Sequence, residues 1–159
     1  MSTPELRLPA RPFISLVDKA SHALSVDMVR EARGRGYPFV RLAHNVVFGT
    51  LFGEGGRISD MAARAGITKQ SMGEVVRELV DLGVLEMAVD PDDRRAKVVT
   101  YTELGLHVTN GGRSYLEKLE ERFAGEFGKA DYETARRVLE GVVALLAESQ
   151  NPSEAVVEG

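Results

Sequence analysis

The sequence has 159 residues, of which 43% are hydrophobic and 28% charged, a composition typical of one globular domain. It contains no cysteine, which excludes disulfides, thiolate metal sites, cysteine nucleophiles and thiol redox sensors. The formal net charge of −4 argues against a protein that binds nucleic acid through its overall charge. Any DNA contact must therefore come from local patches.

Two features bear on cellular location. The longest uninterrupted apolar run, residues 142–147, is far too short to span a membrane. The first residues, MSTPELRLPARP, lack the apolar core of a signal peptide. We therefore expect a cytoplasmic protein with no membrane partner.

The first third of the chain predicts two helices. Apolar residues recur at steps of three and four from Phe13 to Met28, which predicts an amphipathic helix that ends at Gly34 and Gly36. A second helix is expected over residues 39–51, with its apolar positions at Val40, Ala43, Val47 and Leu51.

A pair of helices joined by a tight turn is predicted next. We expect Ser59 to cap a short helix that reaches Ala65, with Gly66 in the left-handed conformation after it. Thr68 is expected to cap a helix that runs to residue 82. This helix has the clearest apolar stripe of the sequence, at Met72, Val75, Val76, Leu79 and Leu82.

The periodicity changes after Gly83. Residues 84–101 predict a β-hairpin whose turn, at 90–93, has the sequence Asp-Pro-Asp-Asp. Residues 57–59 are a candidate for a short third strand. Three cations, Arg94, Arg95 and Lys97, follow the turn.

The remaining third predicts two long helices. Thr102 is expected to cap the first, which reaches about Gly128, and the second opens at 129–131. The pair Gly111-Gly112 interrupts the first and marks either a bend or a close helix crossing. Residues 151–159 are predicted to be a flexible tail.

A short helix, a turn, a longer helix and a charged hairpin are the parts of a winged helix-turn-helix. Its second helix buries an apolar face and presents a polar face to a DNA major groove about 12 Å wide. The polar positions here are Lys69, Gln70, Ser71, Gly73, Glu74 and Arg77. Lysine can reach guanine or phosphate, glutamine can pair with adenine, and glutamate can accept from cytosine N4. Glycine would allow close approach to DNA, and the arginines of the hairpin can enter a minor groove.

At this point the sequence resembles the MarR-type (multiple antibiotic resistance regulator) winged helix-turn-helix transcriptional regulators. The resemblance is carried by Asp90-Pro91-Asp92-Asp93-Arg94-Arg95-Ala96-Lys97 and by Thr102-Glu103-Leu104-Gly105, which are similar to the family's wing and to its entry into the next helix. It implies a mainly α fold within a single chain of residues 1–159. The DNA-binding lobe would span 37–101, and the dimerisation helices would span 12–36 and 102–150.

The resemblance also implies a function. The chain would be a homodimeric, sequence-specific DNA-binding regulator that binds a pseudo-palindromic operator in double-stranded DNA. We expect it to act as a repressor. A small aromatic or phenolic ligand would release it, with Arg41 and His44 as ligand-binding candidates. The implied DNA-binding residues are Thr68, Lys69, Gln70, Ser71, Gly73, Glu74, Arg77, Asp93, Arg94, Arg95 and Lys97, with Arg95 in the minor groove and held by Asp93.

The sequence departs from the family pattern in places. Many relatives have basic residues where this chain has Met87 and Ala88, and Tyr101 replaces the usual leucine. Glu74 and Glu78 lie in the helix that would read the DNA. These differences indicate weaker attraction to phosphates and a greater dependence on base contacts.

Other interpretations stay open at this stage. Arg94 and Arg95 could belong to a solvated turn paired with Asp92 and Asp93, and the two ligand candidates could be a plain helix surface or a dimer contact. The chain could also be a winged-helix protein-interaction module without DNA binding. No arrangement of residues indicates an enzyme, a metal site or a cofactor site.

Overall fold

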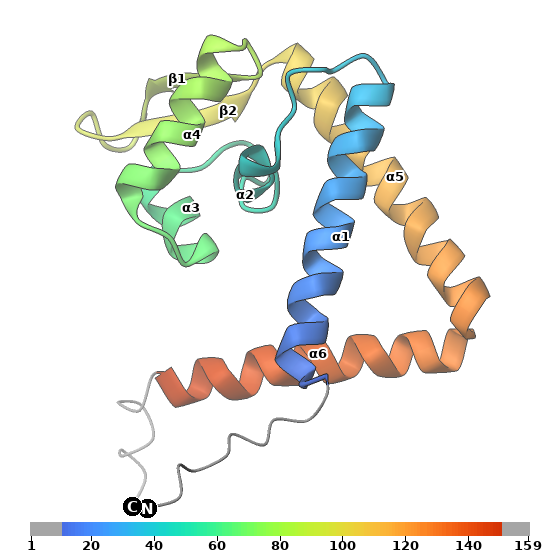
Figure 1. The fold of residues 1–159 in the computed structure, drawn as a ribbon. Helices are drawn as coiled ribbons and strands as arrows, with labels where there is room; N and C mark the ends of the chain where they lie inside the picture. Colours follow the sequence, from blue (N-terminus) through green and yellow to red (C-terminus); the bar gives the residue numbers. More distant parts are fainter. Residues whose placement is uncertain (1–10, 151–159) are drawn as a thin grey trace, which may run out of the picture. The chain divides into compact units, whose positions relative to one another are not determined.

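The computed structural model describes residues 11–150 and is mainly α-helical with one small sheet (Figure 1). It forms two compact units, one that ends at Tyr115 and one that begins at Leu116, so the division falls within a helix. The predicted tail at 151–159 lies outside the described residues.

The first unit contains most of the elements. They are the helix α1 (Phe13–Gly34), the 3-10 turn η1 (Leu42–His44), the helices α2 (Asn45–Phe48), α3 (Ile58–Ala65) and α4 (Lys69–Asp81), and the strands β1 (Leu85–Val89) and β2 (Lys97–Tyr101). The helix α5 (Glu103–Phe127) spans the division, and α6 (Lys129–Gln150) belongs to the second unit. The mainly α class and the winged helix-turn-helix arrangement are confirmed.

The predicted helix over 39–51 is confirmed only for its middle part, residues 42–48. The chain is extended at Arg41 and then forms only the turn η1 and the single-turn helix α2. The Val40 carbonyl, which a continuous helix would use, has another partner here, and a side chain caps the N–H of Arg41. Arg33 Nε donates to the carbonyl of Val40, and the backbone N–H of Arg41 donates to Nδ1 of His44.

Two smaller predictions before α4 are wrong. Ser59 does not cap α3, because the helix begins one residue earlier and Arg57 occupies the cap position without a side-chain bond. Residues 57–59 form no strand, and the only pairing at this point among the described residues is a single bridge between Gly56 and Val99. Pairing cannot continue into 57–59 because the helix α3 begins at Ile58, while the preceding Gly55 has φ +134° and leaves no room for a side chain against β2.

The turn signals around α4 are confirmed. Gly66 has φ +66° after α3, and the Thr68 hydroxyl accepts from the backbone N–H of Ser71 at 3.1 Å. β1 and β2 are antiparallel, with Leu85 opposite Tyr101. The Thr102 hydroxyl likewise accepts from the backbone N–H of Gly105 at the start of α5.

The core of the first unit joins α2, α3, α4 and the hairpin. Its fully buried members include Val47, Met61, Met72, Val76, Leu79, Val84 and Val99. These residues commit one face of α4 to the interior, so the opposite face is left to solvent. A hairpin that packs on the same core extends beyond the helices (Figure 1).

Gly111 and Gly112 lie within a continuous α5, and Gly111 makes room for a side chain and not for the backbone of a crossing helix. A side chain at Gly111 would meet the guanidinium of Arg35, the residue that follows α1, with Cβ 2.5 Å from Cζ. Next to it, Tyr115 donates to Asp27 of α1 at 2.5 Å. The first turns of α5 are therefore fixed against α1 by glycine contacts and polar bonds.

Candidate nucleic-acid interface

The polar face of α4 is exposed from its first turn onward. Thr68 and Ser71 bond to each other at the cap, while Lys69, Gln70, Glu74 and Arg77 all project into solvent. Gln70 Nε2 donates to Glu74 Oε1 at 3.3 Å. The sequence thus correctly predicted an exposed polar face on this helix.

Gly73 differs from what we expected. It is buried and does not offer an open backbone surface, because the Arg77 guanidinium folds back over it. A Cβ at Gly73 would lie 3.2 Å from Nη1 of Arg77. The glycine makes room for this arginine in the free chain, and Arg77 must extend before any close approach at Gly73 is possible.

The start of the hairpin loop is fixed by an ion pair that the sequence did not reveal. Asp90 is buried, and its Oδ2 accepts from Nε and Nη2 of Arg57 at 2.7 and 2.5 Å. Its other oxygen accepts from the backbone N–H of Asp92 at 2.9 Å. The Asp92 N–H and the Arg57 guanidinium hold the pKa of Asp90 below its usual range.

The tip of the hairpin carries the cations. Asp93 Oδ1 accepts from the backbone N–H of Arg95 at 3.0 Å, so this carboxylate shapes the turn instead of pairing with a guanidinium. The side chains of Arg94, Arg95 and Lys97 are exposed, and no ion pair engages them within residues 11–150. The alternative interpretation, a turn in which these arginines pair with Asp92 and Asp93, is not what the structure has.

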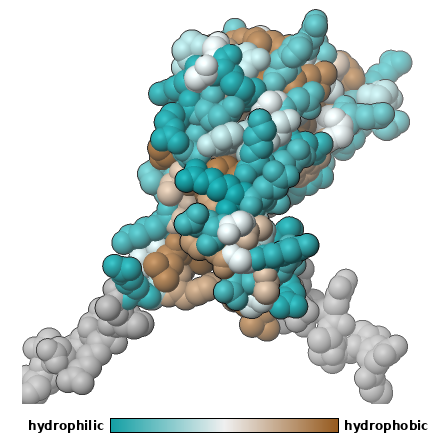
Figure 2. All heavy atoms as spheres, turned by 90° about the vertical axis from the view of Figure 1, so that its right-hand side faces the viewer, coloured by the Kyte–Doolittle hydropathy of each residue, from teal (hydrophilic) through white to brown (hydrophobic). Residues whose placement is uncertain are grey.

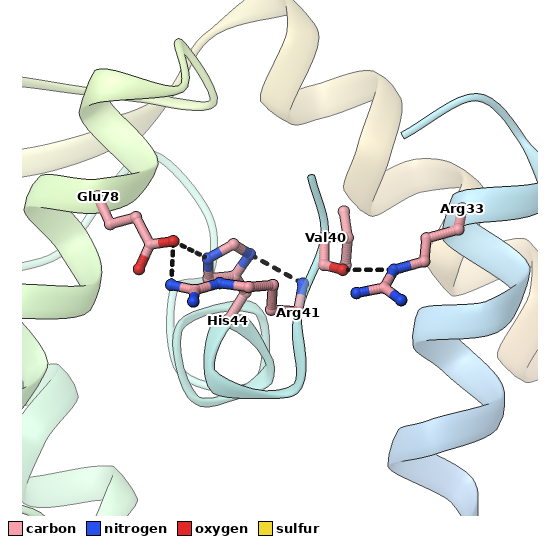
Figure 3. A network of polar contacts seen from close by, with 5 residues as sticks. All are labelled: Arg33, Val40, Arg41, His44 and Glu78. Atoms are coloured by element: carbon pink, nitrogen blue, oxygen red, sulfur yellow. Dashed lines mark hydrogen bonds and ion pairs between the residues drawn. The ribbon is translucent and has the colours of Figure 1, made fainter. Parts of the chain in front are cut away.

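Arg41 and His44 are brought together, but around a carboxylate of the protein itself (Figure 3). Glu78 of α4 forms an ion pair with Arg41, and its Oε1 lies 3.2 Å from Nε2 of the fully buried His44. The hydrogen bond from Arg41 is the main cause that lowers the pKa of Glu78. This contact ties η1 to the helix that presents the polar face.

The two nitrogens of His44 have different roles. Nδ1 accepts from the backbone N–H of Arg41 at 3.2 Å, so it carries no proton. Nε2 then carries the proton and donates to Glu78. A neutral ring thus satisfies both partners, and burial of His44 leaves no polar atom unpaired.

Sequence patterns identified the tip of the hairpin and the polar face of α4 but missed the groups that hold them. Arg57, Asp90 and Glu78 lie 33 to 37 residues from their partners. Among the described helices none is long and apolar enough to cross a membrane. That part of the chain also contains no cluster of three histidine or acidic side chains suited to a metal ion.

Comparison with known proteins gives the fold. No protein-family profile and no curated protein matches the sequence. Solved structures do match, among them one described as a MarR family transcription regulator, with a TM-score of 0.72 and 14% identity over 87% of this chain and 90% of that one. The chain has the winged-helix fold of the MarR family regulators.

Two further structures with this fold contain bound molecules. A mutant of MepR from S. aureus, bound to an oligodeoxyribonucleotide, has a TM-score of 0.54 and 17% identity over 85% of this chain and 98% of that chain. CouR from Rhodococcus jostii, bound to p-coumaroyl-CoA, has a TM-score of 0.64 and 19% identity over 80% of this chain and 89% of its own. Several other structures with this fold are named as transcriptional regulators, among them SlyA, with a TM-score of 0.71 and 12% identity over 86% of this chain and 94% of that one.

Proposed function

We propose that this chain is a sequence-specific DNA-binding transcriptional regulator, a repressor, that acts as a homodimer. The observation that carries the proposal is the hairpin tip. The first residue of its loop, the buried Asp90, is fixed by an ion pair with Arg57, while Arg94, Arg95 and Lys97 are exposed to solvent. In this fold α4 would enter a major groove, and Arg95 would enter the adjacent minor groove.

Homodimer formation is supported by apolar side chains that a single chain leaves in water. In the first unit, α1 exposes Phe13, Ile14 and Leu16. In the second unit, α6 exposes Val138, Val143 and Leu146. Figure 2 shows such hydrophobic side chains at a surface that is otherwise largely hydrophilic. Exposed apolar surfaces of this kind are typical of protein interfaces. In the proposed dimer, the dimerisation helices would lie within residues 12–36 and 102–150.

A dimer would place two copies of α4 in successive major grooves, about 34 Å apart, on a pseudo-palindromic site. The experiment is a selection of bound sequences from a random duplex library, with the oligomeric state measured by light scattering. We expect an enriched site with two inverted halves and a dimeric mass. A monomer that enriches no sequence would refute the proposal and favour a protein-interaction module.

A small acidic or phenolic ligand is part of the proposal, because Arg41 and His44 form a site that accepts a carboxylate. In the free chain Glu78 occupies this site. A ligand anion would have to displace Glu78 and would thereby free α4 from η1. Salicylate, used as the probe, should weaken binding to the selected site, and Arg41→Gln should abolish that effect.

A further inference from the structure

The exposed face of α4 has an unusual charge for a surface that enters a DNA groove. Gln70, Glu74, Arg77 and Asp81 recur at the spacing of one helical stripe, and all four are exposed. Two of the four are acidic and one is basic. This stripe therefore gains no affinity from general attraction to phosphates. The repulsion between its acidic side chains and DNA must be offset by specific contacts with the bases.

Glu74 lies in the N-terminal half of this stripe, which is the part of a recognition helix that contacts base edges. No cation pairs with it in the described part of the chain, and its only hydrogen bond there comes from Gln70 Nε2. That bond engages Oε1 and orients the carboxylate, which leaves Oε2 as an acceptor. Gln70 is accordingly a positioning residue for Glu74.

The base edges differ in how they would receive this carboxylate. Guanine and thymine present acceptors in the major groove, so they repel it. The N6 amino group of adenine is flanked by acceptors on both sides, N7 of the same base and O4 of the paired thymine. Cytosine N4 has an acceptor on one side only, the O6 of the paired guanine. Cytosine is therefore the base whose amino group can donate to the Glu74 carboxylate with the least repulsion from neighbouring acceptors.

We infer that Glu74 is a specificity-determining residue that selects one cytosine in each half of the binding site, with Gln70 orienting its carboxylate. The inference rests on the proposed function and adds a base identity to it. One carboxylate–cytosine contact should discriminate against the inverted base pair by roughly tenfold or more. Discrimination at this position should be lost when the carboxylate becomes an amide.

The test is the same random-duplex selection, performed with the full chain and with Glu74→Gln and Asp81→Asn. The two variants remove the same charge from the same exposed stripe, but Asp81 is the last residue of α4, far from the reading end. We expect Glu74→Gln to retain the rest of the site and to replace one cytosine per half by adenine, the base that an amide pairs with. Asp81→Asn should retain the original cytosine.

Fluorescence anisotropy titrations with two duplexes that differ at this one base pair measure the size of the base preference. The parent chain should bind the cytosine duplex roughly tenfold or more tighter than one with that base pair inverted, and Glu74→Gln should lose this preference. An unchanged enriched site in Glu74→Gln would overturn the inference while leaving the proposed function intact. No enriched site for the parent chain would overturn both.

Discussion

The neighbouring glycines of α5 offer a matched pair of substitutions whose effects on stability should differ. Replacing a helical glycine by alanine stabilises a helix by about 1 kcal/mol. At Gly112 the added Cβ would lie 3.5 Å from Cε of Met28, an ordinary van der Waals distance. Gly112→Ala should therefore raise the free energy of unfolding by nearly the whole helix gain of about 1 kcal/mol. At Gly111 the new Cβ would coincide with the Arg35 guanidinium, which must move away.

Displacing Arg35 removes several interactions at once. Its Nη2 donates to the carbonyl of Val108 at 3.2 Å, its Nε donates to Glu31 at 2.9 Å, and the guanidinium lies 5.3 Å from the centre of the Tyr37 ring. Since this side chain is partly exposed, these interactions together contribute about 1–2 kcal/mol. The loss offsets the helix gain, so Gly111→Ala should be about 1–2 kcal/mol less stable than Gly112→Ala.

Urea unfolding followed by circular dichroism measures both variants, and a second background isolates the cause. When Arg35 is already alanine, Gly111→Ala has nothing to displace and should recover the full helix gain of about 1 kcal/mol. If both glycine variants are stabilised equally, or if Gly111→Ala costs the same with and without Arg35, the packing of Arg35 over Gly111 is not what requires this glycine.

Three further predictions concern the interface. Arg95→Ala should weaken binding to the selected duplex roughly tenfold without changing the melting temperature, because within residues 11–150 the side chain has no bonding partner. Unchanged anisotropy titrations would contradict its proposed contact with DNA. The pKa of Asp90 is lowered from 3.8, so its charged form stabilises the fold above that pH, and the benefit is lost as the pH falls through the lowered pKa. Asp90→Asn should thus lower the urea midpoint at pH 6 and flatten its fall towards pH 3, whereas parallel pH curves would refute this. Glu78→Gln should free α4 from Arg41, weaken DNA binding and speed hydrogen exchange of the backbone amides in η1. Unaltered amide exchange would show that the contact of Glu78 with Arg41 does not hold η1 against α4.

The sequence was informative where local rules decide the structure. The Asp-Pro-Asp-Asp turn, Gly66 and Thr68 each act on their immediate neighbours, and all three are found where they were predicted. The segment 39–51 has helical periodicity as well, but Arg33 and His44 capture its backbone groups. The spacing of apolar residues gives no information about side chains that compete with the helix for backbone hydrogen bonds.

The same reasoning explains which part of the candidate site was missed. Exposed cations at a turn follow from the sequence, whereas the ion pair of Arg57 with Asp90 depends on packing α3 against the hairpin. The tie between Glu78 and Arg41 likewise depends on the tertiary fold. Both carboxylates appeared in the sequence as ordinary surface charges. Only the fold identifies them as the groups that hold the wing and the reading helix in place.

The charge distribution separates two contributions to DNA binding in this chain. The cations that can meet phosphates or a minor groove are concentrated at the hairpin tip, while the central stripe of α4 carries Glu74 and Asp81. Raising the salt concentration weakens phosphate contacts far more than base contacts. Neutralising the tip should therefore reduce the salt dependence of binding, and changing Glu74 should alter sequence preference with little effect on that dependence. On the proposed function, the chain would therefore discriminate between sites mainly by the bases it reads, because its overall charge adds no attraction to the duplex.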